Sequence, residues 1–404
     1  MFERHHRALY AAFDRFPSRK GAAIHIDRFA RTLFAHSSGG VLYVIGAPDL
    51  PAHQRDGNVE ILRFNEEIPN FLERTVAYGR SLTGVVDALE DSLAIAHFRD
   101  PWSGMAIALR PGRRYATVYE VNALPSVELP YLFPAVAPGT LAKIRVTELA
   151  CCDAADAIVT PSQTTASFLT SLGVSAAKIR VIPNGADLHT PHARPEDAPS
   201  RYLLYFGSPQ SWQGVDTLLR AFARLADFDG LRLVICGSRY SKGWRRHERL
   251  AAKLGLESRI LWRFELHGAE LAAWVQHADV SVAPLTDSPR NVFQGCAPLK
   301  IVESMAAGVT VVASDVPPVR ELVRDRENGW LVHPDRPGEL ARALRILLDQ
   351  PLLARRLGAA ARNTIEEQFT WERSTSALRA LYESLDEEGA AANVTRERVS
   401  VAHP

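Results

Sequence analysis

The sequence predicts an α/β protein that contains two tandem Rossmann-like, doubly wound domains facing a cleft. Short apolar runs rich in Val, Ile, Leu and Tyr alternate with longer helical stretches, as in parallel sheets covered on both faces. A polar, Pro-rich segment at 189–200 interrupts this alternation, which then starts again. A chain of 404 residues is also too long for one ordinary hydrophobic core.

The first half of the chain is expected to form one domain, residues 1–188. Its strands are predicted at 8–13, 41–45, 59–62, 94–98, 116–121 and 157–160. Its helices are predicted at 24–34, 71–89, 141–154 and 164–172. Nearly continuous apolar strands that are each followed by a helix favour right-handed parallel crossovers, and hence a doubly wound sheet.

The second half repeats this organisation over residues 201–368. Its strands are predicted at 202–206, 232–236, 260–264, 280–284, 310–313 and 330–332. Its helices are predicted at 215–226, 244–254, 269–277, 299–306 and 337–348. A further helical stretch follows at 369–386, and a polar tail is expected at 387–404.

Charge and composition exclude several classes of function. The net charge of +1 gives no reason to expect binding to nucleic acid. The four cysteines lack a CxxC spacing and are expected to be buried thiols. No apolar run resembles a signal peptide or a membrane span, so we expect a cytoplasmic protein.

Ligands of doubly wound sheets bind at the carboxyl ends of the strands. The pattern alone therefore leaves a two-domain transferase, a dehydrogenase and a periplasmic-type binding protein. A dehydrogenase would need a GxGxxG turn after a strand, and the sequence has none. The expected absence of a signal peptide argues against the binding protein.

The strongest motif is NVFQGCAPLKIVESMAAGVTVVASD at 291–315. A polar loop leads into a helix that carries Lys300 and Glu303, and a Val-rich strand follows. The amino end of a helix favours a diphosphate, and a carboxylate there can accept both ribose hydroxyls. An amphipathic helix packed on a sheet would explain the apolar positions, but it does not require Lys300 and Glu303.

These residues resemble the family 4 glycosyltransferases, which are retaining enzymes with the GT-B fold. The matching motifs are LKIVESMAAG, VVASD and RELV, together with 157–187, which ends in PNGAD, and YFGSPQSWQGVD at 205–216. The resemblance extends over nearly the whole chain. It implies a nucleotide-sugar donor in the second domain, an acceptor in the first, and a last helix that crosses back to the first domain. The implied donor-binding residues are Gly207, Ser208, Gln213, Gln294, Gly295, Leu299, Lys300 and Glu303.

The sequence departs from the family at the diphosphate. The family usually places an Arg after the first glycine and a Lys before the second, where this chain has Pro209 (or Ser208) and Gln213. The family's first acidic residue, eight positions before Glu303, is replaced by Gly295. Arg290 and Lys300 are the nearby cations that we expect to compensate.

On the acceptor side, polar residues follow two predicted strands of the first domain. Asp100, Glu120 and Asn122 are expected to be catalytic, together with Lys300 and Arg290; Asn122 stands where many family members have a histidine. His97, in the strand before Asp100, is equally consistent with a core position and with a ligand contact.

The segment 16–25 allows two interpretations. In the resembled family a glycine-rich loop here closes over the reaction centre, which would involve Gly21, Ala22 and His25; the alternative is an ordinary helix entry. Residues 1–36 are basic, with seven Arg and Lys against Glu3, Asp14 and Asp27. This region is either a solvated face or a contact for a phosphorylated or lipid-linked acceptor at the inner face of the membrane.

The resemblance implies transfer of a hexose from a UDP- or GDP-sugar to a sugar or lipid-linked hydroxyl, with retention of configuration. No metal-ligand spacing is present, and no cofactor is expected beyond the donor itself. The missing cations keep a second function open, a GT-B scaffold that binds a nucleotide or glycan without turnover.

Overall fold

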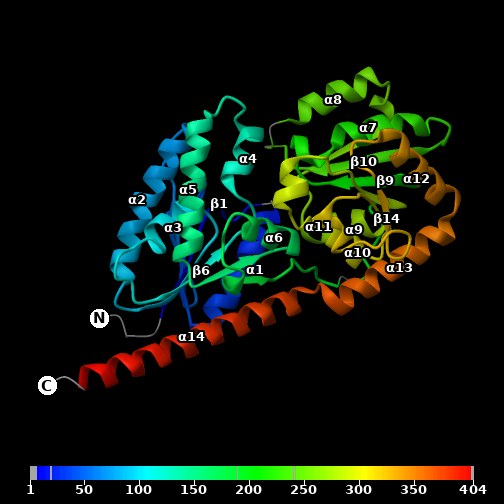
Figure 1. Ribbon diagram of the computed structural model, residues 1–404. Coiled ribbons are helices and arrows are strands. Elements are labelled where there is room, and N and C mark those ends of the chain that lie inside the picture. The colour runs from blue at the N-terminus through cyan, green and yellow to red at the C-terminus, as the bar shows by residue number, and fades with distance from the viewer. Residues whose placement is uncertain (1–6, 19–20, 189, 240, 242, 402–404) are drawn as a thin grey trace. The chain divides into compact units, whose positions relative to one another are not determined.

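The computed structural model describes residues 7–18, 21–188, 190–239, 241 and 243–401 (Figure 1). These residues form two compact units with one sheet each. Unit 1 consists of the described residues of Met1–Pro161, Ala166–Ile182 and Ser374–Pro404, and unit 2 consists of those of Ser162–Thr165 and Pro183–Arg373. The predicted pair of Rossmann-like α/β domains is confirmed.

The sheet of unit 1 has eight strands in the order β3-β4-β2-β1-β5-β6-β7-β8. All neighbouring pairs are parallel except β3 and β4, which are antiparallel. The strands are β1 (Arg7–Arg15), β2 (Gly40–Ile45), β3 (His53–Asp56), β4 (Val59–Phe64), β5 (Leu93–Phe98), β6 (Ala116–Glu120), β7 (Ala157–Thr160) and β8 (Ile179–Val181).

The helices of unit 1 pack apolar faces against this sheet. The side chain of Asn70 starts α2 by accepting hydrogen bonds from the backbone of Leu72 and Glu73. The buried core includes Tyr78 and Leu82 of α2 together with Phe98 of β5. The helices are α1 (Gly21–His36), α2 (Phe71–Leu89), α3 (Pro101–Ile107), α4 (Pro125–Leu132), α5 (Pro138–Ala154) and α6 (Gln163–Ser171), whose first residues belong to unit 2.

The sheet of unit 2 has six parallel strands in the order β11-β10-β9-β12-β13-β14. The strands are β9 (Arg201–Phe206), β10 (Leu231–Gly237), β11 (Ile260–Phe264), β12 (Val280–Ala283), β13 (Val311–Ser314) and β14 (Trp330–Val332). The helices are α7 (Val215–Phe222), α8 (Trp244–Lys253), α9 (Gly268–Gln276), α10 (Leu299–Ala306), α11 (Pro317–Arg320), α12 (Pro337–Asp349) and α13 (Pro351–Gln368).

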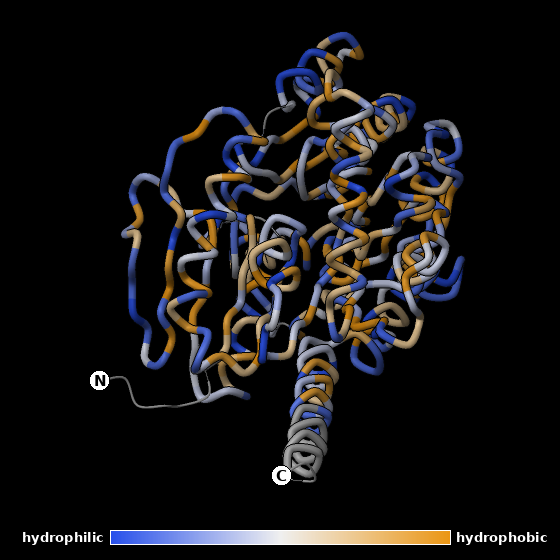
Figure 2. Tube along the Cα trace, turned by 60° about the vertical axis from the view of Figure 1, so that its left-hand side comes forward, coloured by the Kyte–Doolittle hydropathy of each residue, from blue (hydrophilic) through white to orange (hydrophobic). Residues whose placement is uncertain are grey.

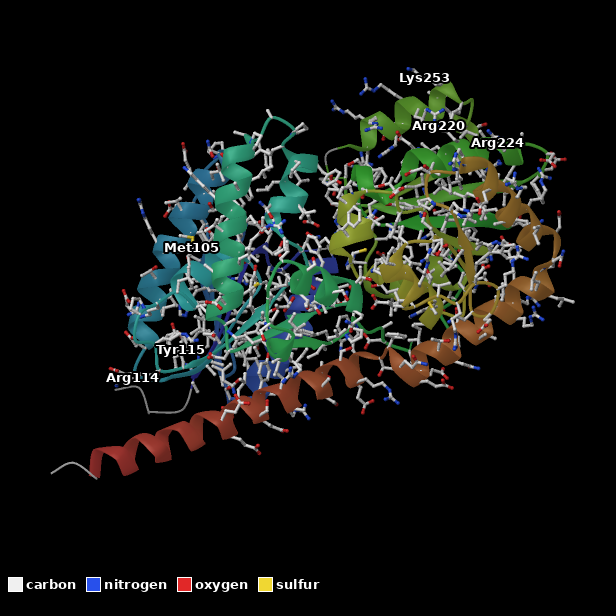
Figure 3. The ribbon with its side chains drawn as sticks, viewed as in Figure 1. Met105, Arg114, Tyr115, Arg220, Arg224 and Lys253 are labelled. Atoms are coloured by element: carbon white, nitrogen blue, oxygen red, sulfur yellow. The ribbon has the colours of Figure 1, made fainter. Side chains whose placement is uncertain are left out.

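Apolar residues run through the inner segments of each unit, and hydrophilic residues gather on the outer helices and turns (Figure 2). Arg220, Arg224 and Lys253 are exposed on the outer side of unit 2 (Figure 3). The four cysteines are buried, and none of them forms a disulfide bond with another described residue. Among the described residues, no helix is both long and apolar enough to span a bilayer.

The last helix, α14 (Trp371–Val401), joins unit 1 from Ser374 onward. It buries Leu378, Leu381, Tyr382 and Leu385, which recur at the three- and four-residue spacing of one helix face. The helix extends to Val401, so the polar tail expected from residue 387 is helical over most of its length.

The sequence analysis did not predict several of the observed helices and strands. Strands β3 and β8, helices α3 and α4, and the long α13 were not expected. The segment predicted as a linker is irregular from residue 190 to 200, but it lies within unit 2. The reason is that this segment is hydrogen-bonded to the last residues of α9. The backbone N–H of His192 donates to Gln276 Oε1 at 2.8 Å, and Gln276 Nε2 donates to the carbonyl oxygen of Thr190 at 3.0 Å. His277 Nε2 lies 2.9 Å from the carbonyl oxygen of His192.

Leu378→Ala should destabilise unit 1, because it removes a fully buried side chain of α14 and leaves a cavity. The expected loss is about 2–5 kcal/mol of unfolding free energy. Arg379→Ala, the neighbouring exposed position on the same helix, is the matched control and should change little. Chemical denaturation followed by circular dichroism measures both. Equal stabilities for the two variants would show that α14 does not contribute to the core.

Candidate functional site

In unit 2 the strand order reverses between β9 and β12, which are hydrogen-bonded neighbours. The chain continues from β9 to β10 and β11 on one side of this pair, and from β12 to β13 and β14 on the other. Such a reversal opens a crevice at the carboxyl ends of the two strands, and ligands of doubly wound sheets bind there. The first candidate cluster, the Lys300 cluster, lies at this edge. It consists of Gln213, Arg290, Lys300 and Glu303.

Two glycines allow the chain to pass closely at this edge. Gly214 has φ +70°, and a Cβ there would lie 1.6 Å from the carbonyl oxygen of Pro284, just after β12. Gly207, directly after β9, has φ +139°, and a Cβ there would lie 3.1 Å from Lys300 Nζ. Only glycine therefore fits these two positions without displacing backbone or the lysine.

Lys300 comes from the first turn of α10 and is buried, with 8% of its surface exposed. Its Nζ donates to Gln213 Oε1 at 2.6 Å and lies 4.0 Å from the centre of the Tyr205 ring. Burial, together with the charge of Arg290, lowers the pKa of Lys300 to about 7. This cation is therefore poorly solvated, and an anionic ligand would favour its charged form.

Arg290 begins a five-residue helical turn, Arg290–Gln294, that follows β12. Its guanidinium lies 4.9 Å from the centre of the Trp212 ring, and Nη1 donates to Asn291 Oδ1 at 3.2 Å. Asn291 fixes the turn by donating to the backbone oxygens of Trp212 at 2.8 Å and Thr286 at 2.9 Å. The turn therefore carries Arg290 at the edge where Lys300 lies.

The rest of the loop before α10 is compact. Gln294 is buried, and Gly295 takes φ +83° where a Cβ would meet the Thr164 side chain at 3.0 Å. Asn184, from the predicted PNG turn, donates to the carbonyl oxygen of Ala297 at 3.0 Å. Leu299 is the first residue of α10. The loop thus sets the start of α10 against the turn at Asn184.

Glu303 lies one helical turn after Lys300 and is half-buried. Burial and the nearby carboxylate of Asp187 raise its pKa to about 7, although the charge of Lys300 opposes both effects. Ser208, the remaining predicted donor residue, accepts a hydrogen bond from Tyr205 Oη at its carbonyl oxygen, at 2.6 Å. The structure therefore brings the predicted cations and Glu303 together at one sheet edge.

A second cluster, the Glu120 cluster, occupies the carboxyl edge of the sheet in unit 1, where β1, β5 and β6 end. The Glu120 carboxylate accepts from Tyr10 Oη at 2.7 Å and Arg99 Nε at 2.7 Å. His25 Nδ1 lies 3.2 Å and His97 Nε2 3.3 Å from it. Asn122 also donates to this carboxylate through its side-chain amide.

The Glu120 carboxylate is ionised. Burial opposes its charge, but Arg99 and the two histidines hold its pKa well below the usual range. His97 is fully buried, and burial lowers its pKa despite the neighbouring Glu120. A carboxylate whose lone pairs already face this many donors has little capacity to take a further proton. The geometry favours a positioning role for Glu120 over proton transfer.

Asp100 serves a local structural purpose. It is the N-cap of α3, where its carboxylate accepts from Ser103 N at 2.8 Å and Ser103 Oγ at 3.1 Å. It also accepts from the backbone N–H of Phe13 at 2.7 Å, which ties α3 to β1. Burial raises its pKa to about 6.

Gly21 and Ala22 lie in the first turn of α1, so of the two interpretations of this segment the structure has the helix entry and not the loop. His25 lies in the next turn of that helix and reaches Glu120. Of the basic residues predicted in 1–36, Arg4, Arg19 and Lys20 lie outside the described residues. Sequence reasoning missed Tyr10, Arg99 and Tyr382; of these only Arg99, which directly precedes Asp100 after β5, had a visible signal.

No three described His, Cys, Asp or Glu side chains gather in a way that could hold a metal ion.

Comparison with known proteins identifies the two halves of the chain. Residues 19–190 match the family model "Glycosyltransferase Family 4", and residues 190–364 match "Glycosyl transferases group 1". A D-inositol 3-phosphate glycosyltransferase of Streptomyces bingchenggensis is 34% identical over 44% of this chain and 39% of its own length. A glycogen synthase of Mycobacterium tuberculosis is 31% identical over 56% of this chain and 54% of its own length. The chain thus matches about half the length of these relatives.

Two solved structures share the fold. Sucrose-phosphate synthase from Thermosynechococcus elongatus superposes with a TM-score of 0.78 at 22% identity, covering 95% of this chain and 100% of that chain. Anabaena Alr3699/HepE, solved in complex with UDP-glucose, superposes with a TM-score of 0.73 at 17% identity, covering 94% of this chain and 100% of that chain. These likenesses show the two-domain GT-B fold.

Glu303→Gln should flatten part of the pH dependence of stability. The folded state holds a proton on Glu303 up to about pH 7, whereas the unfolded chain releases it near 4.5. Stability conferred by this group therefore falls as pH rises between these values. Unfolding free energies across this window should fall less in the variant than in the wild type. Glu248→Gln, at an exposed position of α8, is the control, and an identical slope in all three proteins would contradict the assignment.

Proposed function

Because the chain belongs to the group 1 and family 4 glycosyltransferases, whose two models together cover residues 19–364, we propose that it transfers a hexose from a UDP- or GDP-sugar to a sugar or lipid-linked hydroxyl. The transfer keeps the anomeric configuration. The relatives named as an inositol phosphate glycosyltransferase and a glycogen synthase, and the neighbour that binds UDP-glucose, support a nucleotide-sugar donor.

One observation carries this proposal: the buried Lys300 at the β9–β12 reversal. Its ammonium group lies beside Gly207 and on Gln213, where a family lysine is replaced by glutamine. The ammonium group of Lys300, from α10, thus lies next to Gln213, the neutral residue at the position of the family's lysine. A leaving diphosphate gains negative charge during transfer, and a preorganised cation in a poorly solvated site stabilises that charge strongly.

The other residues of the Lys300 cluster complete a donor site. Arg290 adds a second positive charge and can fork onto two phosphate oxygens. The start of α10, at Leu299 and Lys300, presents the positive end of a helix to the same anion. Glu303 accepts the ribose hydroxyls, with which a carboxylate forms charge-assisted hydrogen bonds.

The reaction needs no enzymic nucleophile. The acceptor hydroxyl attacks the anomeric carbon from the face that the diphosphate leaves, and the departing phosphate oxygen takes the hydroxyl proton. The protein then supplies charge stabilisation and orientation, which account for much of enzymic rate enhancement. The Glu120 cluster has no spare proton acceptor on its carboxylate, which agrees with a mechanism that does not use one.

The Glu120 cluster is proposed to orient the acceptor. Arg99 and Asn122, held by Glu120, are polar groups at the sheet edge that suit sugar hydroxyls or a phosphate on the acceptor. A lipid-linked acceptor would bring the protein to the inner face of the membrane, and the remaining basic residues of 7–36 are the proposed contact.

The second candidate is a scaffold that binds a nucleotide or glycan without turnover. It is favoured by Pro209 and Gln213, which stand where the family usually has the Arg and Lys that hold the donor diphosphate. Incubation with UDP- and GDP-sugars, with and without sugar acceptors, separates the two. Release of UDP or GDP supports the enzyme, whereas donor binding without any release supports the scaffold.

Lys300→Ala should reduce kcat by about a hundredfold or more, the effect of losing one transition-state donor. Arg290→Ala should have an effect of the same order. Lys253→Ala, which removes an exposed lysine of unit 2, is the control and should transfer at the wild-type rate. Steady-state transfer with the best donor is the measurement. Normal turnover in both Lys300→Ala and Arg290→Ala would refute the compensation of the missing family cations.

Glu303→Gln should raise the Kd of the nucleotide sugar at least about tenfold, because it replaces charge-assisted hydrogen bonds of about 1.5–3 kcal/mol each by neutral ones. The Kd of free nucleoside should rise with it, because the ribose is common to both ligands. Isothermal titration measures the two constants. An unchanged Kd would place the ribose elsewhere.

A further inference from the structure

A chain of buried polar contacts links the last helix to the carboxyl edge of the sheet in unit 1. The hydroxyl of Tyr382, on α14, lies 2.7 Å from His97 Nδ1. His97 Nε2 lies 3.3 Å from Glu120 Oε2, and the other oxygen of Glu120 holds Arg99 and Asn122. Tyr382, His97 and Glu120 are all at most 1% exposed.

The surroundings of these residues determine which atom donates and which accepts at each contact. Glu120 is ionised and can only accept, so the hydrogen on neutral His97 must lie on Nε2. His97 Nδ1 is then an acceptor, and Tyr382 must donate to it. The pKa of Tyr382 is raised well above its usual value, by burial and by the charge of Glu120, so that the hydroxyl keeps its proton.

The rings around His97 leave it little room to turn. Tyr10 packs against it with ring centres 4.9 Å apart, and Tyr382 meets it edge-on at 6.0 Å. The Tyr10 hydroxyl donates to the same Glu120 oxygen that His97 approaches. Tyr382 therefore donates the hydrogen bond to His97 Nδ1 that stabilises the tautomer set by Glu120, and packing holds the ring in position.

We propose that Tyr382 is a positioning residue for the acceptor side of the transfer reaction. It acts through His97, which fixes Glu120, which in turn fixes Arg99 and Asn122 at the sheet edge. This inference rests on the proposed function, because it assigns these residues to the acceptor. The donor residues belong to unit 2 and to the Lys300 cluster, so a defect that starts at Tyr382 should spare the donor.

The test compares two Tyr→Phe variants in the same unit. Tyr382→Phe removes the donor to His97. Tyr119→Phe is the matched control: this tyrosine is also fully buried, but its hydroxyl has no hydrogen-bond partner among the described residues. The expected result for Tyr382→Phe is a fall of about tenfold or more in kcat/KM for the acceptor, with an unchanged donor Kd. Tyr119→Phe should match the wild type.

A spectroscopic measurement tests the link without relying on activity. In protein labelled with ¹⁵N-histidine, the nitrogen shifts of His97 should report a neutral ring protonated at Nε2. Tyr382→Phe should move the Nδ1 shift toward that of an acceptor without a donor or mix the two tautomers, whereas Tyr119→Phe should not. A His97 ring protonated at Nδ1 in the wild type would overturn the proposed order of hydrogen bonds.

The outcomes separate this inference from the proposed function. If the wild type transfers sugar and both Tyr→Phe variants transfer equally well, Tyr382 has no positioning role. An equal loss of donor affinity and acceptor kcat/KM in Tyr382→Phe would indicate a general loss of structure and would also overturn it. If the wild type releases no nucleotide with any donor while the His97 shifts are as expected, it is the proposed function that fails.

Discussion

Each unit buries a charged group at the edge where its strands end, Glu120 in unit 1 and Lys300 in unit 2, and the polar organisation of these edges follows from that constraint. A buried charge must be paired or surrounded by hydrogen-bonding groups, since desolvation otherwise costs several kcal/mol. Unit 1 meets the requirement: Glu120 accepts hydrogen bonds from Tyr10, Arg99 and Asn122. The rings of His25 and His97 lie within 3.2 and 3.3 Å of the same carboxylate. Unit 2 meets it only in part, because Lys300 has a neutral glutamine and an aromatic ring as its neighbours.

This difference suits the roles proposed for the two clusters. A saturated carboxylate is rigid and holds its donors in place, which is useful for orientation. An ammonium group with few hydrogen-bond acceptors around it lowers the stability of the free protein, and binding of an anion would restore that stability. Sites that are built for ligands commonly sacrifice stability in this way. The lowered pKa of Lys300 and the raised pKa of Glu303 have the same main origin, because burial disfavours the charged form of both groups.

The sequence was most informative where the residues of a site are contiguous. Lys300 and Glu303 share one helix with a recognisable motif, and the helix 299–306 and the strand 260–264 were predicted at their observed bounds. The Glu120 cluster was predicted only in part. Tyr10 is 110 residues from Glu120, and Tyr382 is 285 residues from His97, so no local pattern connects them. Asp100 directly follows a strand, which is a position typical of catalytic residues. A helix that begins with proline also favours an aspartate at this position, as its N-cap, and the sequence does not distinguish the two roles.

Unit 1 is assembled from two distant parts of the chain, and this has a consequence for biosynthesis. The polypeptide leaves the ribosome from its amino end, at about 5–20 residues per second. His97 therefore emerges roughly 15 to 60 seconds before Tyr382, which follows 285 residues later. Throughout that interval the nascent sheet lacks the apolar face of α14, whereas the residues of unit 2 up to Arg373 are all synthesised before the interval ends. The second unit can thus fold as soon as Arg373 has emerged, whereas the first can close its core only after α14 has been synthesised as well.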